Sequence, residues 1–481
     1  MPIKENFPIN AIIGSFFIAL VCIFVGKGIS ISPTIIPFVL VISMFVFLLT
    51  FIKTDLVMLI LIYAMLLSPE INFGAISSHR AIAIRIEDLL IIVFSLAWFA
   101  RLALHSRLSL IKKTPINRWI ALYAAIFTLS TIKGMLTNDV KPLLGTFYIL
   151  KYLEYFLVYY LVLGIIKSKL QVKAYLKAFI ITFTIVNIYA YTQIGSGRVS
   201  APFEGQIGEP NTLGGYQVLI LGIIMGLLSH MRLKKWRWPL IALALFSLVP
   251  FAYTLSRTSY LAIIPTYITV IILHKTKRRN IFVGVLMMAI ILLIFFFPAN
   301  VKERILYTFV PLKQEGIPTF KILGVELGPS ASARLNSWSI AVNKWKQKPF
   351  IGYGLTASGF LDSQYFSNIV ELGSFGLVAF LALLSSIFRN TLKIYKNSND
   401  EIFKGLSLGF LAGHVGLLFH AIAANTFIII RIMEPYWFLL AMIMAIPKIE
   451  RSQENIPNIE IEEKKVKNLK NTDILLHSKT A

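Results

Sequence analysis

Three arginines stand in separate segments of the chain that are expected to face outward. Arg198 lies in GRVSAPFEGQIGEPNTLGGY, Arg257 lies in the short turn TLSRTSY, and Arg334 lies near the start of SARLNSWSIAVNKWK. Arginine can bind phosphate oxygens through two parallel hydrogen bonds and keeps its charge in a dry site. Close to a bilayer it is costly unless it pairs, binds an anion or reaches the interface. The set predicts a diphosphate site at a membrane surface, with simple snorkelling as the alternative.

Two carboxylates follow these arginines along the chain. Asp362 and Glu371 lie in LDSQYFSNIVELGSFG, a segment that begins polar and becomes apolar. Either group could serve as a general base. Glu371 falls inside the apolar run, where an ionisable side chain is a candidate functional residue. Asp362 and Glu371 are therefore both candidate general bases.

Four further residues are candidates for other substrate contacts. Asn211 and Gln364 each stand where a polar segment passes into an apolar run. Gly352 and Gly354 follow Pro349, which ends an amphipathic helix expected along the membrane surface. Glycines allow the backbone to approach a bound molecule closely. The alternatives are an ordinary connector and a plain interfacial helix.

Composition places the chain in a membrane. Of its 481 residues, 57% are hydrophobic and 15% are charged, and the mean hydropathy is +0.73. So few charges could not cover the surface of a soluble protein of this length. Apolar runs long enough to cross about 30 Å of hydrocarbon recur along the chain, and in lipid such runs form helices. We expect an all-α polytopic integral membrane protein.

The cationic residues follow the pattern of cytoplasmic loops. The net charge of +24 is spread over clusters between apolar runs, as in KKTPINR, RLKKWR and KTKRR, which argues against a nucleic-acid partner. Placing these clusters inside predicts about 14 spans (a range of about 11 to 14), with both termini cytoplasmic and the first run retained. The single cysteine, Cys22, excludes an internal disulfide. The expected spans are 10–26, 33–51, 54–68, 87–104, 117–133, 146–166, 177–194, 212–230, 238–255, 258–274, 281–298, 366–388, 405–423 and 427–447.

The chain divides into three expected parts. Residues 1–196 form N-terminal transmembrane helices, residues 197–447 carry the candidate site and a long outer loop at 299–365, and residues 448–481 form a disordered cytoplasmic tail. The remaining intramembrane polar residues are expected to serve structure. They are the i, i+3 pairs Lys151–Glu154 and Arg431–Glu434, and the packing residues His414 and His420.

The motifs taken in order resemble the bacterial O-antigen polymerase and ligase family. The resemblance rests on SRTSYL, SARLNSWSIAVNKWKQKPFIGYGL and DSQYFSNIVELGSFGLVAFLALL. These contain the family's S-R pair, its loop arginine, its P-x-x-G-x-G element and its E-x-G-x-x-G-L element. The upstream segment ending in Pro210 and Asn211 is similar to the family's arginine-containing segment before a span. The resemblance covers about residues 197–384.

This resemblance implies an inverting glycosyltransferase with a GT-C-like fold that requires no metal or cofactor. The donor would be a polyprenyl-diphosphate-linked oligosaccharide, on the outer face of a bacterial inner membrane, and a glycan would be the acceptor. Chain-length regulator and flippase proteins would be partners. Ligases of the family carry His-Asn where this chain has Asp362 and Ser363, which favours a polysaccharide polymerase. By the same resemblance Asp362 would be the general base that accepts a proton from a sugar hydroxyl, with Glu371 as the alternative. A ligase to lipid A core or protein, and a flippase or transporter of lipid-linked glycans, remain the alternatives.

Overall fold

The computed structural model describes residues 45–50, 52–77, 80–104, 112–204, 209–232, 234–274, 321–322, 325–326, 329–359 and 361–477. Several predicted features lie outside this part of the chain. They are the expected spans 10–26 and 281–298, most of span 33–51, Cys22, and residues 299–320 of the outer loop.

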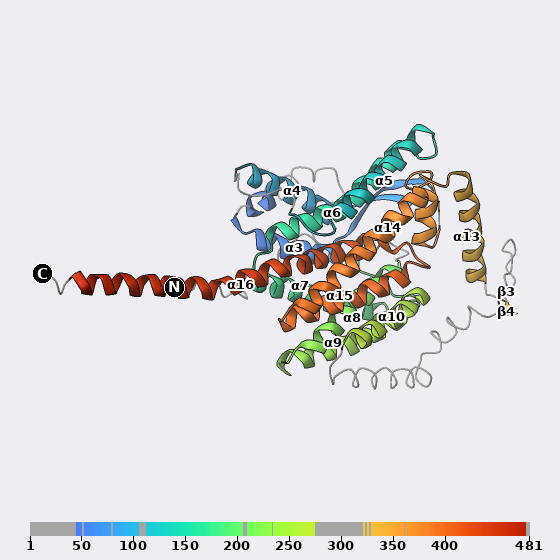
Figure 1. Ribbon diagram of the computed structural model, residues 1–481. Helices are drawn as coiled ribbons and strands as arrows, with labels where there is room; N and C mark the ends of the chain where they lie inside the picture. Colours follow the sequence, from blue (N-terminus) through green and yellow to red (C-terminus); the bar gives the residue numbers. More distant parts are fainter. Residues whose placement is uncertain are drawn as a thin grey trace.

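Helices form almost all of the described structure (Figure 1). Eight of them are long and apolar enough to cross a membrane, and α3 and α10 are shorter apolar helices, so the multi-pass helical prediction is confirmed. The full number of spans and the GT-C-like fold stay predictions. The helices are α3 (Thr54–Leu67), α4 (Ile86–Leu104), α5 (Asn117–Leu136), α6 (Pro142–Ile165), α7 (Lys169–Thr192), α8 (Pro210–His230), α9 (Lys234–Tyr253), α10 (Arg257–Leu273), α13 (Pro329–Gln347), α14 (Gln364–Asn397), α15 (Glu401–His420), the 3-10 turn η2 (Thr426–Ile428) and α16 (Ile430–His477).

Two short antiparallel hairpins interrupt the helical pattern. Strands β1 (Glu70–Ser77) and β2 (Arg80–Arg85) pair in the segment between α3 and α4, which corresponds to the connection between the expected spans 54–68 and 87–104. Ile82 and Ile84 alternate with alanines there, and β-branched residues at alternate positions favour a strand. Strands β3 (Lys321–Ile322) and β4 (Val325–Glu326) form the second hairpin, ahead of α13.

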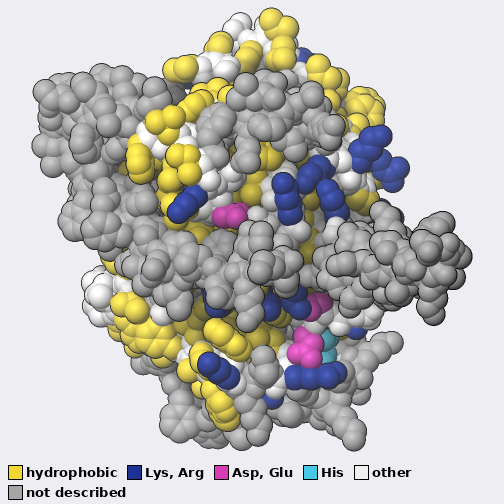
Figure 2. All heavy atoms as spheres, turned by 90° about the vertical axis from the view of Figure 1, so that its left-hand side faces the viewer, with side chains coloured by type: hydrophobic (Ala, Val, Ile, Leu, Met, Phe, Trp, Pro, Cys, Tyr) yellow, Lys and Arg dark blue, Asp and Glu magenta, His cyan; other side chains and the backbone are white. Residues whose placement is uncertain are grey.

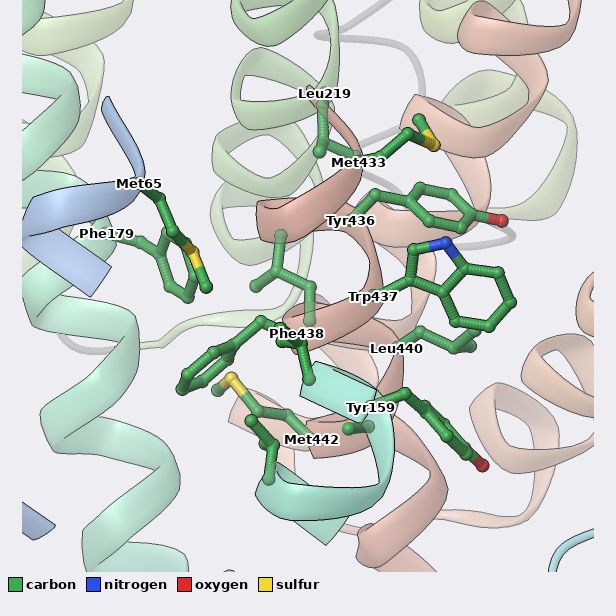
Figure 3. Packing of buried hydrophobic residues seen from close by; sticks show 14 of the residues in the cluster. Met65, Tyr159, Phe179, Leu219, Met433, Tyr436, Trp437, Phe438, Leu440 and Met442 are labelled. Carbon is green, nitrogen blue, oxygen red and sulfur yellow. The ribbon is translucent and has the colours of Figure 1, made fainter. Parts of the chain in front are cut away.

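Helix α16 forms the centre of the bundle. Its side chains from Ile432 to Ile446 are buried on every face, as expected for a helix that is apolar all round and enclosed by others. Trp437 packs edge-on against Tyr159 of α6 with ring centroids 5.9 Å apart, and Phe438 packs against Phe179 of α7 at 5.3 Å (Figure 3).

Beyond the bundle, α16 continues to His477 and projects away from the other helices (Figure 1). The sequence predicted a disordered tail from Lys448, because this segment is polar and mixed in charge. The structure instead extends the helix, and the segment's many glutamates and lysines are good helix formers.

Glycines bring α8 and α15 into backbone contact. A Cβ atom on Gly226 would lie 2.2 Å from the backbone nitrogen of Gly409, and a Cβ on Gly222 would lie 2.8 Å from that of Gly413. Small residues allow membrane helices to approach this closely. The contact fixes the start of α8 relative to the end of α15, and both lie at the end of the bundle that carries the candidate site.

Polar contacts define the two ends of the bundle. At the end we call the basic end, Lys169 pairs with Asp400 where α7 and α15 begin, and Arg232 pairs with Glu401 at 2.9 Å. Figure 2 faces this end and shows Lys and Arg side chains gathered over it. The opposite end, here called the site end, is where α10, α14 and α16 begin. Lys and Arg clusters at one end of the helices fit the positive-inside pattern.

Candidate functional site

A break in α14 receives the glycine-containing segment that follows α13. Gly373 interrupts the helix with a φ of 67°. The freed backbone groups of α14 bond to this segment: Ser374 N–H donates to the Pro349 carbonyl at 2.8 Å, and the Glu371 carbonyl accepts from Gly354 N–H at 2.7 Å. The P-x-x-G-x-G and E-x-G-x-x-G-L motifs are therefore two halves of one structural unit.

Gly352 and Gly354 are required by this docking. A Cβ on Gly352 would lie 2.6 Å from the carbonyl carbon of Glu371, and one on Gly354 would lie 3.0 Å from the Cα of Thr131 in α5. Both residues also have positive φ angles, which side chains disfavour. The close backbone approach that the sequence assigned to a bound molecule is made here to α14 and α5. Direct substrate contact by these glycines stays a prediction.

The carboxylate of Glu371 organises the same loop. It accepts hydrogen bonds from the Thr356 backbone N–H at 3.0 Å and the Ser358 hydroxyl at 2.6 Å, and the residue is 2% exposed. The Ser130 hydroxyl of α5 donates to the Glu371 carbonyl at 2.8 Å. These bonds give Glu371 an evident structural role that the sequence did not predict.

Asp362, the first predicted base, lies beside Arg334. Its Oδ2 is 3.7 Å from the Arg334 Nε, an ion pair too long for a hydrogen bond, and its side chain is 37% exposed. Partial burial raises the pKa of Asp362, and the neighbouring Arg334 charge opposes that rise. One helical turn further along each segment, Trp338 of α13 stacks on Phe366 of α14 at 5.0 Å. The two contacts hold α13 against the start of α14.

Arg198 lies against the turn that carries Arg257. Its Nε donates to the Thr254 carbonyl at 3.1 Å and its Nη2 approaches the Leu255 carbonyl at 3.4 Å. Arg257 is the first residue of α10, directly after the N-cap Ser256. The structure therefore brings together two of the three predicted arginines, although they are 59 positions apart in the sequence.

A buried chain of hydrogen bonds runs beneath this turn. The Ser256 hydroxyl donates to Asn211 Oδ1 at 2.7 Å, and the Ser259 hydroxyl lies 2.8 Å from Ser256 Oγ. His420 at the end of α15 joins the chain, with Nε2 3.2 Å from Ser259 Oγ and Nδ1 2.7 Å from Thr426 Oγ1. The sequence predicted a packing role for His420, and its actual polar role depends on contacts that no local motif signals.

Further hydrogen bonds attach the Asp362 segment to the residues after α15. Gln364 accepts from Phe427 N–H at 2.9 Å through its Oε1, and Asn425 donates to the Leu361 carbonyl at 2.6 Å. Gln364 is 2% exposed and also donates to Asn368 at 3.1 Å. Gln364 therefore serves as an internal anchor in this structure, and its contact with substrate stays a prediction.

Arg431 attaches the loop before α8 to the helix bundle through hydrogen bonds. It is fully buried and donates to the carbonyls of Leu66, Ser68, Pro202 and Phe203. Its Nε lies 4.0 Å from Glu204 Oε1, so Glu204 is the carboxylate ion-paired with Arg431, whereas the sequence predicted Glu434. Burial raises the pKa of Glu204 to about 7, against the lowering effect of Arg431.

A second group of buried charges lies between α4, α6 and α16. Lys151 pairs with Glu154 at 3.0 Å, as predicted, and with Asp88 at 2.5 Å. The carboxylates of Glu87, Asp88 and Glu434 offer oxygens within 4.8 Å of one another. Such oxygens could hold a hard cation, but the Lys151 ammonium already supplies positive charge to this group.

The site elements coincide with a match to a known family. Residues 241–381 match the family model described as O-Antigen ligase. This segment, hereafter the O-antigen ligase segment, is similar to that family. It contains Arg257, Arg334, Asp362 and the paired glycine motifs, so the resemblance inferred from the sequence is confirmed. Arg198, Asn211 and His420 lie outside the O-antigen ligase segment. A comparison with curated proteins found no match.

Proposed function

We propose that this protein is a polysaccharide polymerase that joins polyprenyl-diphosphate-linked oligosaccharide units at the outer face of a bacterial inner membrane. The observation that carries the proposal is the ion pair between Arg334 and Asp362 within the O-antigen ligase segment. Arg198 and Arg257 lie together at the same end of the bundle. These four side chains supply the two chemical functions that glycosyl transfer from a diphosphate requires.

The first function is proton removal by Asp362. A hydroxyl of the acceptor sugar would transfer its proton to the Asp362 carboxylate while its oxygen attacks the anomeric carbon of the donor. The carboxylate is partly exposed and has a raised pKa, and both properties suit a general base. Glu371 is less suitable, because its carboxylate already accepts hydrogen bonds from Thr356 and Ser358.

The second function is stabilisation of the leaving group. As the new glycosidic bond forms with inversion, the bond between the anomeric carbon and the diphosphate oxygen breaks, and its electron pair leaves with polyprenyl diphosphate. Arg198, Arg257 and Arg334 would bind the phosphate oxygens and stabilise the charge that develops there. No covalent intermediate with the protein is required.

A ligase is the second candidate, because the matching family model is described as O-Antigen ligase. Both reactions use the same donor and differ in the acceptor. Asp362 and Ser363 at the position of the family's His-Asn pair favour the polymerase.

Deletion of the gene separates the two candidates. A polymerase deletion should leave single repeat units on the lipid carrier or at the cell surface, and restoring the wild-type gene should restore long chains. Long polymer that persists on the carrier, with only its final transfer lost, would identify a ligase. Glycan length on the carrier and at the surface can be measured separately by gel electrophoresis of the extracted lipids.

A further inference from the structure

The buried chain of hydrogen bonds from His420 to Asn211 has a defined donor-to-acceptor direction. Each hydroxyl in it has a single hydrogen to donate. The amide of Asn211 is oriented with Oδ1 towards Ser256, so the Ser256 hydrogen is given to Asn211 at 2.7 Å. Ser256 must then accept from Ser259, at 2.8 Å. Since the Ser259 hydrogen is used in that bond, the 3.2 Å contact with His420 requires a donor on His420 Nε2.

This assignment also fixes the other ring nitrogen. In a neutral imidazole, a hydrogen on Nε2 leaves Nδ1 as an acceptor. Thr426 Oγ1 lies 2.7 Å from Nδ1 and can donate to it. The chain therefore runs in one direction, from Thr426 through His420, Ser259 and Ser256 to the carbonyl oxygen of Asn211.

The consequence appears at Asn211, which is only partly buried at the start of α8. Because its oxygen is held by Ser256, the two amide hydrogens of its Nδ2 point away from Ser256. A donor there suits an anion, whereas an outward oxygen would repel one. Ser256 is the N-cap of α10 and immediately precedes Arg257, so the same chain also supports the turn that carries this arginine.

The side chains of this hydrogen-bond chain are tightly packed against α8. A Cβ on Gly214 would lie 2.1 Å from Ser259 Oγ, and one on Gly215 would lie 3.3 Å from His420 Cε1. Ser259 and His420 are both fully buried. Helices α8, α10 and α15 thus meet closely around these polar side chains, at Gly214 and Gly215 of α8.

We infer that His420 is a positioning residue. In its neutral Nε2–H form it orients Ser259 and Ser256 so that Asn211 presents amide hydrogens to the diphosphate of the lipid-linked donor. This inference rests on the proposed function for the identity of the ligand. The orientation of the chain rests on the structure alone, and the two parts can be tested separately.

The first test reads the state of the His420 ring. Purified full-length protein with ¹⁵N-labelled histidine should show one neutral Nε2–H imidazole that disappears in His420→Gln. An Nδ1–H form, or a doubly protonated ring, would overturn the proposed direction of the chain. This result does not depend on any enzymatic activity.

The second test measures the dissociation constant of a short polyprenyl diphosphate for purified variants. Asn211→Asp keeps an oxygen for Ser256 but replaces the outward amide with a carboxylate, so affinity should fall about 10- to 100-fold. His420→Leu should weaken binding, and His420→Gln, which retains a donor near Nε2, should restore most of it. Wild-type protein that fails to bind the diphosphate would overturn the role of Asn211.

Two comparisons exclude a merely structural effect. His414→Leu removes another buried histidine from α15, one that bonds to Tyr436 at 2.8 Å, and it should leave diphosphate affinity unchanged. If His420 acts through Asn211, then His420→Leu should cause no further loss in an Asn211→Ala background. Fully additive losses would contradict the inference. If affinity behaves as expected while wild-type protein makes no polymer, then only the proposed reaction is wrong.

Discussion

Arg334 Nε lies 3.7 Å from Asp362 Oδ2, so the predicted phosphate-binding arginine and the predicted base form one ion pair. Both side chains are partly exposed, at 24% and 37%, although the Arg334 Nε atom itself is buried. The pair joins α13 to the residue just before the N-cap of α14. A ligand that draws Arg334 towards a phosphate would change the charge environment of the base.

This coupling predicts a pH effect. The Arg334 charge lowers the pKa of Asp362, so Arg334→Gln should raise that pKa further. A general base works only when deprotonated, and its activity is lost as pH falls through its pKa. The acidic limb of the rate profile should therefore move to higher pH in Arg334→Gln, in addition to any loss of rate. Rates measured across a pH series test this, and an unmoved acidic limb would separate Arg334 from the base.

Arg257 is expected to stabilise the leaving diphosphate. Its loss in Arg257→Ala should cost about 2–4 kcal/mol of transition-state stabilisation, a rate decrease of roughly 30- to 1000-fold. Arg257→Lys should recover little, because a point charge lacks the planar fork of a guanidinium. Polymer length and protein abundance in the membrane are the measurements. Arg232→Ala, at the exposed pair with Glu401 on the basic end, is the matched control and should behave as wild type. Wild-type polymer from Arg257→Ala would indicate that this arginine only snorkels.

Gly352→Ala should disrupt the docking of the glycine segment into α14. The new methyl would lie 2.6 Å from the Glu371 carbonyl carbon, and the residue would hold a φ of +72°. We expect strongly reduced abundance of folded protein. Gly359→Ala is the control, because Gly359 has a similar φ of +68° but no atom within 4 Å of an added Cβ. It should cost only the backbone strain of about 1–2 kcal/mol. Equal effects of the two substitutions would show that steric contact with α14 is unimportant.

Glu204 predicts a pH-dependent stability. Its pKa rises from an ordinary value of 4.5 to about 7 in the folded protein, chiefly through burial. Between these values the folded protein holds a proton that the unfolded chain has released, so stability falls as pH rises through this window. The full effect is about 3 kcal/mol. Thermal unfolding in detergent from pH 5 to 8 should show this decline in the wild type, and Glu204→Gln should lack it. A decline of the same size in both proteins would assign it to other groups.

Much of the helical fold could be predicted from the sequence, because membrane helices satisfy their own backbone and are visible as apolar runs. The start of α8 at Pro210 and of α10 at Arg257 differ from expectation by only one or two residues. The hairpin of β1 and β2 was not predicted, because the alternation of apolar residue types over so short a segment is equally consistent with a loop. Residues outside the described chain leave the expected number of spans a prediction.

The site could be predicted only as a set of residue types. Arginine close to a membrane is costly enough to indicate function, which is why Arg198, Arg257 and Arg334 were predicted, and their contact with phosphate stays a prediction. Contacts between distant segments leave no such local signal. The insertion of residues 349–354 into the break at Gly373, and the meeting of His420 with Ser259, depend on how α14 and α15 pack against their neighbours.

Asp362 is proposed to accept a proton during transfer of sugar from a lipid diphosphate. The direct measurement is the rate at which purified protein, supplied only with polyprenyl-diphosphate-linked repeat units, forms longer lipid-linked chains and releases polyprenyl diphosphate. Wild-type protein should do both, and Asp362→Asn should be slower by roughly 100- to 10,000-fold. Asp139→Asn, which alters the ion pair with Lys348 instead, should keep most of the rate. Wild-type rates from Asp362→Asn would show that Asp362 is not the general base.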